Sequence, residues 1–153
     1  MTAPILIIGI GNPSRGDDAL GPLCIERLEA LNLQDVELLT DFQLQVEFAL
    51  DLAGRREVVF VDAAVSGAQP YEFRPVGRDT GPSHTSHAIS PEAVLAACAR
   101  VGVQPPDEAH VLAIRGYGFE LGESLSQQAE SNLREAMDLL RSRLMPERTI
   151  ETE

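Results

Sequence analysis

The sequence predicts an α/β fold of three layers, in which a mostly parallel, twisted sheet of about five strands lies between helices on both faces. Two observations predict this fold. Short apolar runs rich in β-branched residues alternate along the chain with longer stretches whose apolar residues recur every three or four positions. The apolar runs also lack the polar alternation of a half-exposed strand, which is typical of parallel strands buried on both faces.

The individual elements follow from this pattern in chain order. The expected strands cover residues 4–10, 36–40, 57–61, 71–76 and 109–115. The run at 71–76 alternates, so this strand is expected at an exposed edge of the sheet. The first helix is expected somewhere between residues 18 and 31, and the other expected helices cover residues 43–52, 90–101 and 124–144. Ser90 followed by Pro91 is a typical helix start, and Gly102 is a typical helix end.

Length and charge predict a single α/β domain over residues 1–145, followed by an acidic flexible tail at 146–153. Acidic residues outnumber Lys and Arg by 24 to 12, which gives a net charge of −12. This charge repels nucleic acids and anionic membranes, so neither is expected as a partner. The sequence shows no secretion signal and no apolar run of membrane-spanning length, so a cytoplasmic location is expected.

The sequence identifies no catalytic nucleophile. Cys24 and Cys98 lie in apolar helical stretches, where we expect free, buried thiols in a reduced compartment. The G-x-S-x-G serine motif is absent from the sequence. The catalytic residues therefore stay unassigned, and any hydrolysis is expected to depend on metal-bound water.

The stretch from Ile5 to Gly21 joins an apolar strand to a glycine turn and then to a polar loop that ends in Asp17 and Asp18. In open parallel sheets, binding sites lie at the carboxyl ends of the strands, where the strand order reverses. If the first strand lies between the second and the third, then Asp17, Asp18 and Asp62 face one crevice. Asp41, which follows the second strand, is expected at its rim.

A dinucleotide site is one alternative for this loop. Gly9 and Gly11 provide the first half of a G-x-G-x-x-G motif, but Ser14 occupies the third glycine position. Such a loop directs backbone N–H groups at a pyrophosphate. The carboxylates of Asp17 and Asp18 would repel that group, so the sequence disfavours a nucleotide ligand.

Two other interpretations of the carboxylates stay open at the level of sequence. Paired aspartates before a helix commonly cap it and interact with its dipole. Carboxylates that converge in a partly dry crevice instead need a cation or a proton to offset their repulsion, and a divalent metal supplies that offset. His84 and His87 lie in a loop that is expected over the same edge, and an imidazole beside two carboxylates is a common mixed metal-binding set. His110 is interpreted as structural.

The motifs together resemble those of the hydrogenase maturation endopeptidase family. The resemblance rests on Gly9-x-Gly11-Asn12-x-x-x-x-Asp17-Asp18-x-x-Gly21, on Asp62 after the apolar run Val-Val-Phe-Val, and on His87 before the helix at 90–101. The segment Phe119-Glu120-x-Gly122-Glu123-Ser124-Leu125-Ser126 is also similar to the family's segment before the last helix. The resemblance extends from about Ile5 to Leu144, nearly the whole chain.

The resemblance implies an endopeptidase that removes a C-terminal extension from the large-subunit precursor of a nickel-iron hydrogenase after nickel insertion. By position, it implies that Asp18, Asp62 and His87 bind the nickel. The metal is expected to arrive with the substrate, and another divalent cation can take its place in a crystal. The resemblance does not distinguish a metal used for recognition alone from one that also activates water.

The remaining expectations concern substrate contacts and the alternative function. Asp17, Asp41 and Gln43 are expected to contact the substrate, with Asp17 either capping the helix or holding its loop. The hydrogenase large-subunit precursor is the expected partner, and the protein itself is expected to be a monomer. The alternative function is a non-catalytic chaperone that holds nickel or the precursor at the same site without cutting it.

Overall fold

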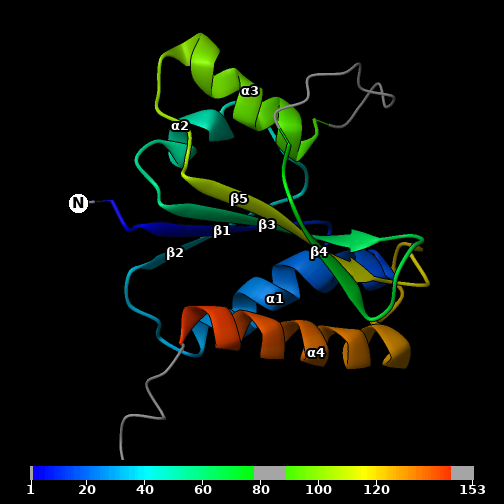
Figure 1. The fold of residues 1–153 in the computed structure, drawn as a ribbon. Coiled ribbons are helices and arrows are strands. Elements are labelled where there is room, and N and C mark those ends of the chain that lie inside the picture. The colour runs from blue at the N-terminus through cyan, green and yellow to red at the C-terminus, as the bar shows by residue number, and fades with distance from the viewer. Residues whose placement is uncertain (1, 78–88, 146–153) are drawn as a thin grey trace, which may run out of the picture.

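The computed structural model describes residues 2–77 and 89–145, and Figure 1 shows them as a sheet between two layers of helices. The strands are β1 (Ile5–Ile10), β2 (Val36–Asp41), β3 (Glu57–Ala64), β4 (Tyr71–Pro75) and β5 (Glu108–Arg115). The helices are η1 (Gly16–Ala19), a 3-10 turn, and α1 (Leu20–Glu29), α2 (Phe48–Leu52), α3 (Pro91–Val101) and α4 (Gln127–Leu144). The predicted tail at 146–153 lies outside the described residues.

The sheet has the strand order β2-β1-β3-β5-β4. β1 pairs in parallel with β2 and β3, and β3 pairs in parallel with β5. β4 is antiparallel to β5 and forms one edge, which confirms the edge strand predicted from its alternation. The three-layer, mostly parallel fold and the position of β1 between β2 and β3 are confirmed, so the strand order reverses beside β1 as a binding crevice requires.

Each face of the sheet has its own hydrophobic core. Alternate residues of β1 point to opposite faces, so Ile5 and Ile7 pack with α1 and α4, whereas Leu6 and Ile8 pack with α2 and α3. Figure 1 shows these two helix pairs on opposite sides of the sheet. The cysteines are free and buried, one in each core, as the sequence predicted. Among the helices of residues 2–77 and 89–145, none is long and apolar enough to cross a membrane.

The helix boundaries differ from the sequence prediction at two places. The first helix lies within its predicted range, and it is preceded by the 3-10 turn Gly16–Ala19 and becomes α-helical at Leu20. The second was expected over 43–52 but covers only Phe48–Leu52, because residues 43–47 form no helix and Leu44 packs into the core instead. The last begins at Gln127, where the Ser126 hydroxyl caps it by accepting a hydrogen bond from the Ala129 N–H group.

α1 packs close to the sheet at Gly21. A Cβ atom on Gly21 would lie 2.3 Å from the Ile10 carbonyl oxygen and 2.8 Å from the Val61 carbonyl oxygen. A Cβ atom on Gly9 would in turn lie 2.5 Å from the Gly21 carbonyl oxygen. Backbone atoms cannot rotate away as side chains do, so the two glycines let the start of α1 lie directly against β1 and β3. This packing holds the loop with Asp18 at the edge of the sheet.

The substitution Gly21→Ala tests this packing. It is expected to lower the free energy of unfolding by about 2–3 kcal/mol, because the added methyl group overpacks a rigid backbone contact. Urea denaturation followed by circular dichroism measures the loss. Gly118→Ala is the control, because its Cβ atom would meet only the flexible end of Glu123 at 3.0 Å. Equal losses in the two variants would contradict the account.

Candidate functional site

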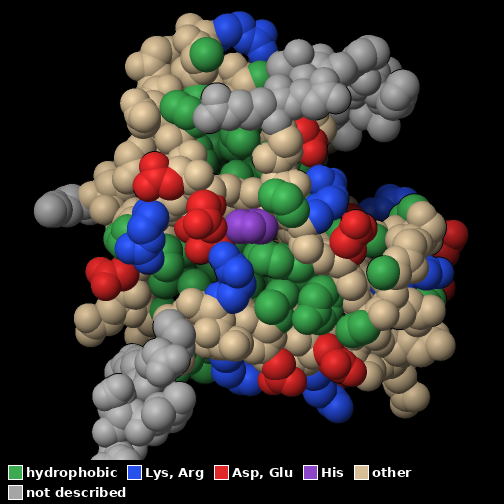
Figure 2. Space-filling view, in the orientation of Figure 1, with side chains coloured by type: hydrophobic (Ala, Val, Ile, Leu, Met, Phe, Trp, Pro, Cys, Tyr) green, Lys and Arg blue, Asp and Glu red, His purple; other side chains and the backbone are tan. Residues whose placement is uncertain are grey.

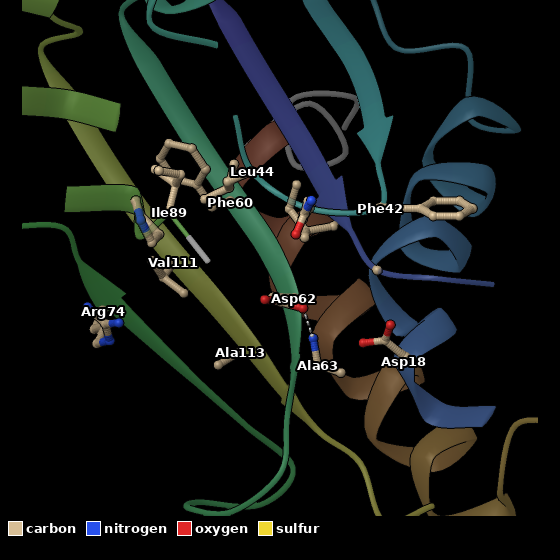
Figure 3. Close-up of a pocket in the computed structure, with 14 residues that line it drawn as sticks. Asp18, Phe42, Leu44, Phe60, Asp62, Ala63, Arg74, Ile89, Val111 and Ala113 are labelled. Atoms are coloured by element: carbon tan, nitrogen blue, oxygen red, sulfur yellow. Dashed lines mark hydrogen bonds between the residues drawn. The ribbon is translucent and has the colours of Figure 1, made fainter. Parts of the chain in front are cut away.

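A cavity of about 370 Å³ opens at the carboxyl ends of β1 and β3, on the face of the sheet that α2 and α3 cover. Figure 3 shows its two carboxylates, Asp62 on β3 and Asp18 beside the helical segment that follows β1. Most of the other lining side chains are apolar and come from the sheet and the segments above it: Ile10, Phe42, Leu44, Phe60, Ala63, Ile89, Pro91, Val111 and Ala113. The cavity therefore combines an acidic side with an apolar floor, as many ligand sites do.

Asp62 lies near the carboxyl end of β3 and is partly buried. Its Oδ1 atom accepts a 2.8 Å hydrogen bond from the Ala63 N–H group. Burial raises the pKa of Asp62 to about 7, the hydrogen bond from Ala63 opposes the rise, and the charge of Asp18 adds to it. The ionised form of Asp62 therefore lowers the stability of the fold near neutral pH, and a bound cation would offset this loss.

Asp18 lies in η1, directly after the β1 loop, and its carboxylate lines the same cavity. Its Oδ2 atom accepts a 2.7 Å hydrogen bond from the Asn12 N–H group, so the side chain is held by the loop from which it projects. The effect of Asp18 on the pKa of Asp62 shows that the two carboxylates interact. The structure thus brings together two of the three residues predicted as metal ligands.

Asp17 faces the opposite way from Asp18 and is fully buried, with 0% of its surface exposed. Its Oδ2 atom accepts hydrogen bonds from the Tyr117 N–H group at 2.7 Å, the Gly118 N–H group at 3.1 Å and the Ser126 hydroxyl at 2.7 Å. Its Oδ1 atom accepts one from the Ser126 N–H group at 2.8 Å. Burial, the largest effect, raises the pKa of Asp17, but these hydrogen bonds outweigh it and lower the pKa below its usual value.

This arrangement corrects the expectation that Asp17 contacts the substrate. Its carboxylate is enclosed, and both oxygens bind groups of this chain. Of the two roles that the sequence left open, holding the loop is the one observed, because the Asp17 carboxylate accepts its hydrogen bonds from Tyr117, Gly118 and Ser126 and not from the helix that follows it. Ser126 connects it to α4 instead, since the same hydroxyl that donates to Asp17 caps that helix.

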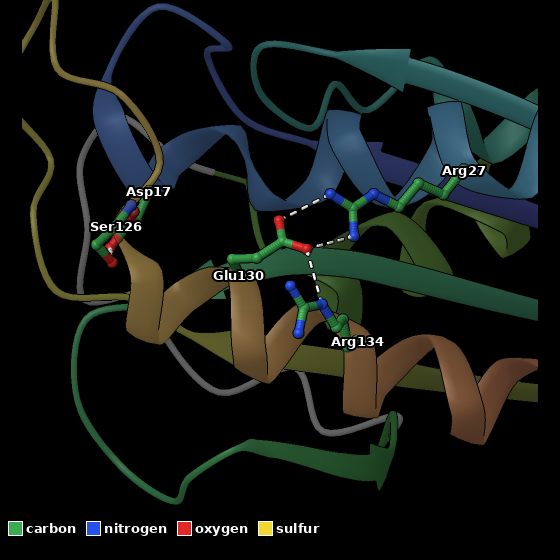
Figure 4. A network of polar contacts seen from close by, with 5 residues as sticks. All are labelled: Asp17, Arg27, Ser126, Glu130 and Arg134. Atoms are coloured by element: carbon green, nitrogen blue, oxygen red, sulfur yellow. Dashed lines mark hydrogen bonds and ion pairs between the residues drawn. The ribbon is translucent and has the colours of Figure 1, made fainter.

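A second polar contact fixes α4 against α1. Both nitrogens at the end of Arg27 donate to Glu130, at 3.0 and 2.8 Å, and Arg134 donates to the same carboxylate at 3.2 Å. Figure 4 shows this cluster beside the contact between Asp17 and Ser126. A two-pronged arginine–carboxylate pair is geometrically specific. The loop that carries Asp18 is thus connected to a helix that is itself anchored to α1.

The predicted substrate residues Asp41 and Gln43 lie near the cavity. Gln43 is exposed and lines it. Asp41 instead lines an adjoining hollow of about 330 Å³, together with Phe42, and its Oδ1 atom accepts a 2.6 Å hydrogen bond from the Phe42 N–H group. The exposed ring of Phe42 borders both spaces. His84 and the third predicted ligand, His87, lie outside the described residues.

His110 belongs to a different part of the molecule, at the amino ends of β3 and β5. It stacks on Phe73 with ring centroids 4.6 Å apart, and its Nδ1 atom lies 3.3 Å from a carboxylate oxygen of Glu57. Candidate ligand atoms of His110, Glu57 and Glu108 lie within 4.8 Å of one another. The Arg143 guanidinium lies 2.6 Å from Glu57 and 3.9 Å from Glu108, so it already supplies positive charge to this cluster.

Arg74 is the lining residue that sequence reasoning missed. It projects from β4 and is the only basic side chain among the described residues of the cavity. Nothing in the sequence around β4 marks it, because its position depends on the antiparallel pairing of β4 with β5. The sequence likewise does not mark the apolar floor, since Val111 and Ala113 lie within a stretch that was predicted only as a strand.

Comparison with known proteins gives the same fold. No protein-family model and no curated protein matches the chain. One similar solved structure is the NiFe hydrogenase maturation protease HycI from Thermococcus kodakarensis KOD1, whose sequence is 26% identical to this chain. The alignment covers 93% of this chain and 92% of HycI, with a TM-score of 0.72. An endopeptidase from Escherichia coli, solved in solution, is 26% identical over 90% of each chain, with a TM-score of 0.68. The hydrogenase maturating endopeptidase HybD from Escherichia coli aligns with a TM-score of 0.74 over 92% of this chain and 91% of HybD. At 23% sequence identity, this match shows that the two proteins share a fold.

The chain thus has an α/β fold similar to that of solved peptidases, with an acidic cavity at the carboxyl ends of its parallel strands. More narrowly, the two solved proteins at 26% identity, a hydrogenase maturation protease and an endopeptidase, support the family that the motifs around Asp18 and Asp62 had indicated.

Replacing the buried carboxylate tests the anchoring role of Asp17. Asp17→Asn is expected to lower the free energy of unfolding by about 2–4 kcal/mol at pH 7, since an amide nitrogen would then face N–H donors. The pKa of Asp17 is lowered in the folded state, so this stabilisation is present above the ordinary value of 3.8 and is lost as the pH falls through the folded pKa. Denaturation at pH 7 and pH 3 measures both effects. The neighbouring variant Asp18→Asn is the control, and an equal loss in it would contradict the account.

Asp62→Asn is expected to have the opposite effect on stability. The pKa of Asp62 is raised from 3.8 to about 7, so its ionisation destabilises the fold as the pH rises through that range. The amide can still accept the hydrogen bond from Ala63. The variant should therefore be more stable than the wild type by about 2–4 kcal/mol at pH 8 and equally stable near pH 3.

Urea denaturation at the two pH values measures this difference. Asp138→Asn is the matched control, because it removes one negative charge from a side chain that is 77% exposed. A variant of Asp62 that is no more stable at pH 8 than this control would contradict the raised pKa.

Proposed function

We propose that this chain is an endopeptidase that removes the C-terminal extension of a nickel-iron hydrogenase large-subunit precursor after nickel insertion. Asp18, Asp62 and His87 bind the nickel that the substrate carries. The observation that carries the proposal is the pair of interacting carboxylates, from the β1 loop and from β3, that line one cavity in a chain similar to solved maturation peptidases.

The donor set fits such an ion. Two carboxylates and an imidazole form a mixed oxygen and nitrogen set that suits divalent first-row metals. Nickel at this position would favour the ionised form of Asp62, whose pKa is otherwise raised by burial. The ion would also polarise a peptide carbonyl beside it. Substrate nickel then serves as a signal, because the site is complete only when a loaded precursor is bound.

The residues around the carboxylates have separate roles in this proposal. Asn12 holds Asp18 through its backbone N–H group, and Ala63 holds Asp62 in the same way, so both carboxylates are oriented before the substrate arrives. Gln43 and Asp41 contact the substrate at the rim of the cavity. The apolar floor accommodates side chains of the peptide that crosses it and limits the access of water to the site.

A non-catalytic chaperone for nickel or for the precursor would use the same carboxylates. The likeness to the maturation protease and to the endopeptidase, each over about nine-tenths of the chain, favours hydrolysis. Intact-mass measurement of the precursor after incubation separates the two functions. Loss of the extension supports the peptidase, whereas a stable complex with an unchanged precursor mass supports the chaperone.

The central test is cleavage of the precursor with and without nickel. The wild-type protein should cut only the nickel-loaded form. Asp18→Asn, Asp62→Asn and His87→Ala should each slow cleavage by roughly 100-fold or more, since loss of even an outer partner of a metal ligand typically reduces affinity or activity by roughly 10–100-fold.

Control variants make that result specific. Asp138→Asn and His84→Ala should cleave at the wild-type rate, because the first alters a surface charge and the second a histidine close to His87 in the sequence. Circular dichroism should show that all the variants are folded. Normal processing by Asp18→Asn or His87→Ala would refute the proposed ligand set.

A further inference from the structure

The charges that line the cavity are separated across the sheet edge. Asp18 and Asp62 lie on one side, and Arg74 lies on the other, as Figure 3 shows. All three side chains line the same space, and the lining between them is apolar. An occupant of this cavity therefore meets negative charge at one end and positive charge at the other, which selects both its chemistry and its direction.

Strand register sets the distance between these ends. Asp62 on β3 is paired with Ala113 of β5, and Arg74 on β4 is paired with Val111 of β5. Two inter-strand steps of about 4.8 Å and an offset of two residues at about 3.3 Å each place the two Cα atoms roughly 12 Å apart. An extended peptide spans about 3.3–3.6 Å per residue, so three or four residues bridge the gap.

The contact that Arg74 makes is weak enough to be exchanged. Within the described part of the chain, it is one hydrogen bond of 3.3 Å to Glu92, and the Arg74 side chain is 43% exposed. Exposed pairs of this kind contribute little to stability. Arg55, in contrast, is only 4% exposed at its side chain and donates to three acceptors, as expected for a structural arginine.

We infer that Arg74 binds a carboxylate of the substrate's C-terminal extension, three or four residues from the residue held at Asp18 and Asp62. This inference rests on the proposed function. A guanidinium presents a planar set of donors that matches a carboxylate, and a second carboxylate can replace Glu92. The extension is the part bound, because a cavity of about 370 Å³ accepts an extended peptide but not a folded domain.

Steady-state cleavage of the nickel-loaded precursor tests the inference. Arg74→Gln should raise KM about tenfold and leave kcat unchanged, because it removes a charge-assisted contact that is made equally in the ground state and the transition state. Arg74→Lys should give an intermediate KM, since it retains the charge but not the planar donors.

Glu92→Gln is the matched control, because it breaks the same ion pair and leaves the guanidinium in place. Its KM should equal or fall below that of the wild type. If Arg74 serves only to pair with Glu92, then Glu92→Gln and Arg74→Gln will impair cleavage equally, and the inference is overturned.

Two altered precursors identify the source of the carboxylate. In one, the acidic side chains of the extension are replaced by amides, and in the other, the C-terminus is lengthened by two serines to displace the terminal carboxylate. The precursor that lacks the carboxylate bound by Arg74 should be cut by the wild type with a KM about tenfold higher than that of the unaltered precursor. The Arg74→Gln variant should cut this altered precursor and the unaltered one with the same KM, because the contact is already lost.

If neither altered precursor changes KM, or if both effects persist in Arg74→Gln, the inference is overturned. Failure of the wild type to cut the loaded precursor would refute the proposed function itself. Normal cutting by the wild type together with an unchanged KM in Arg74→Gln would refute only the role of Arg74.

Discussion

The buried carboxylate of Asp17 is the constraint on which the site depends. It accepts hydrogen bonds from the turn at Tyr117 and Gly118 and from Ser126, the residue that caps α4. These contacts connect the β1 loop to a segment about a hundred positions further along the chain. Because Asp18 is the next residue, fixing Asp17 on the inner side of the loop leaves Asp18 on the cavity side.

Asp17 and Asp62 lie in the same region of the molecule, but their surroundings shift their pKa values in opposite directions. Asp17 is more buried than Asp62, yet its pKa is lowered, because N–H and hydroxyl donors surround it. The pKa of Asp62 is raised, because it has burial, one hydrogen bond and a negative neighbour. Asp17 therefore stabilises the fold, whereas ionised Asp62 weakens it, and in the proposed function a bound cation would offset that cost. Destabilised residues of this kind are expected at functional sites.

The sequence was sufficient for the sheet and for the convergence of Asp18 with Asp62. A continuous apolar run predicts a buried parallel strand, and parallel strands end at the same edge, so both carboxylates could be placed without long-range information. The role of Asp17 could not be predicted, because its donors lie far along the chain. Arg74 was missed for a related reason, since only the register of β4 on β5 places it at the cavity. The second helix was predicted too long, because the packing of Leu44 overrides its helical spacing.

The most direct test of the account is X-ray absorption at the nickel edge, measured on the loaded precursor alone and on the precursor mixed with this protein and frozen before cleavage. The account predicts that complex formation adds oxygen or nitrogen ligands to the nickel, and that Asp18→Asn and Asp62→Asn each alter this added coordination. A nickel spectrum that stays the same when the wild-type protein binds, while cleavage proceeds after thawing, would show that the two carboxylates do not bind the metal of the substrate.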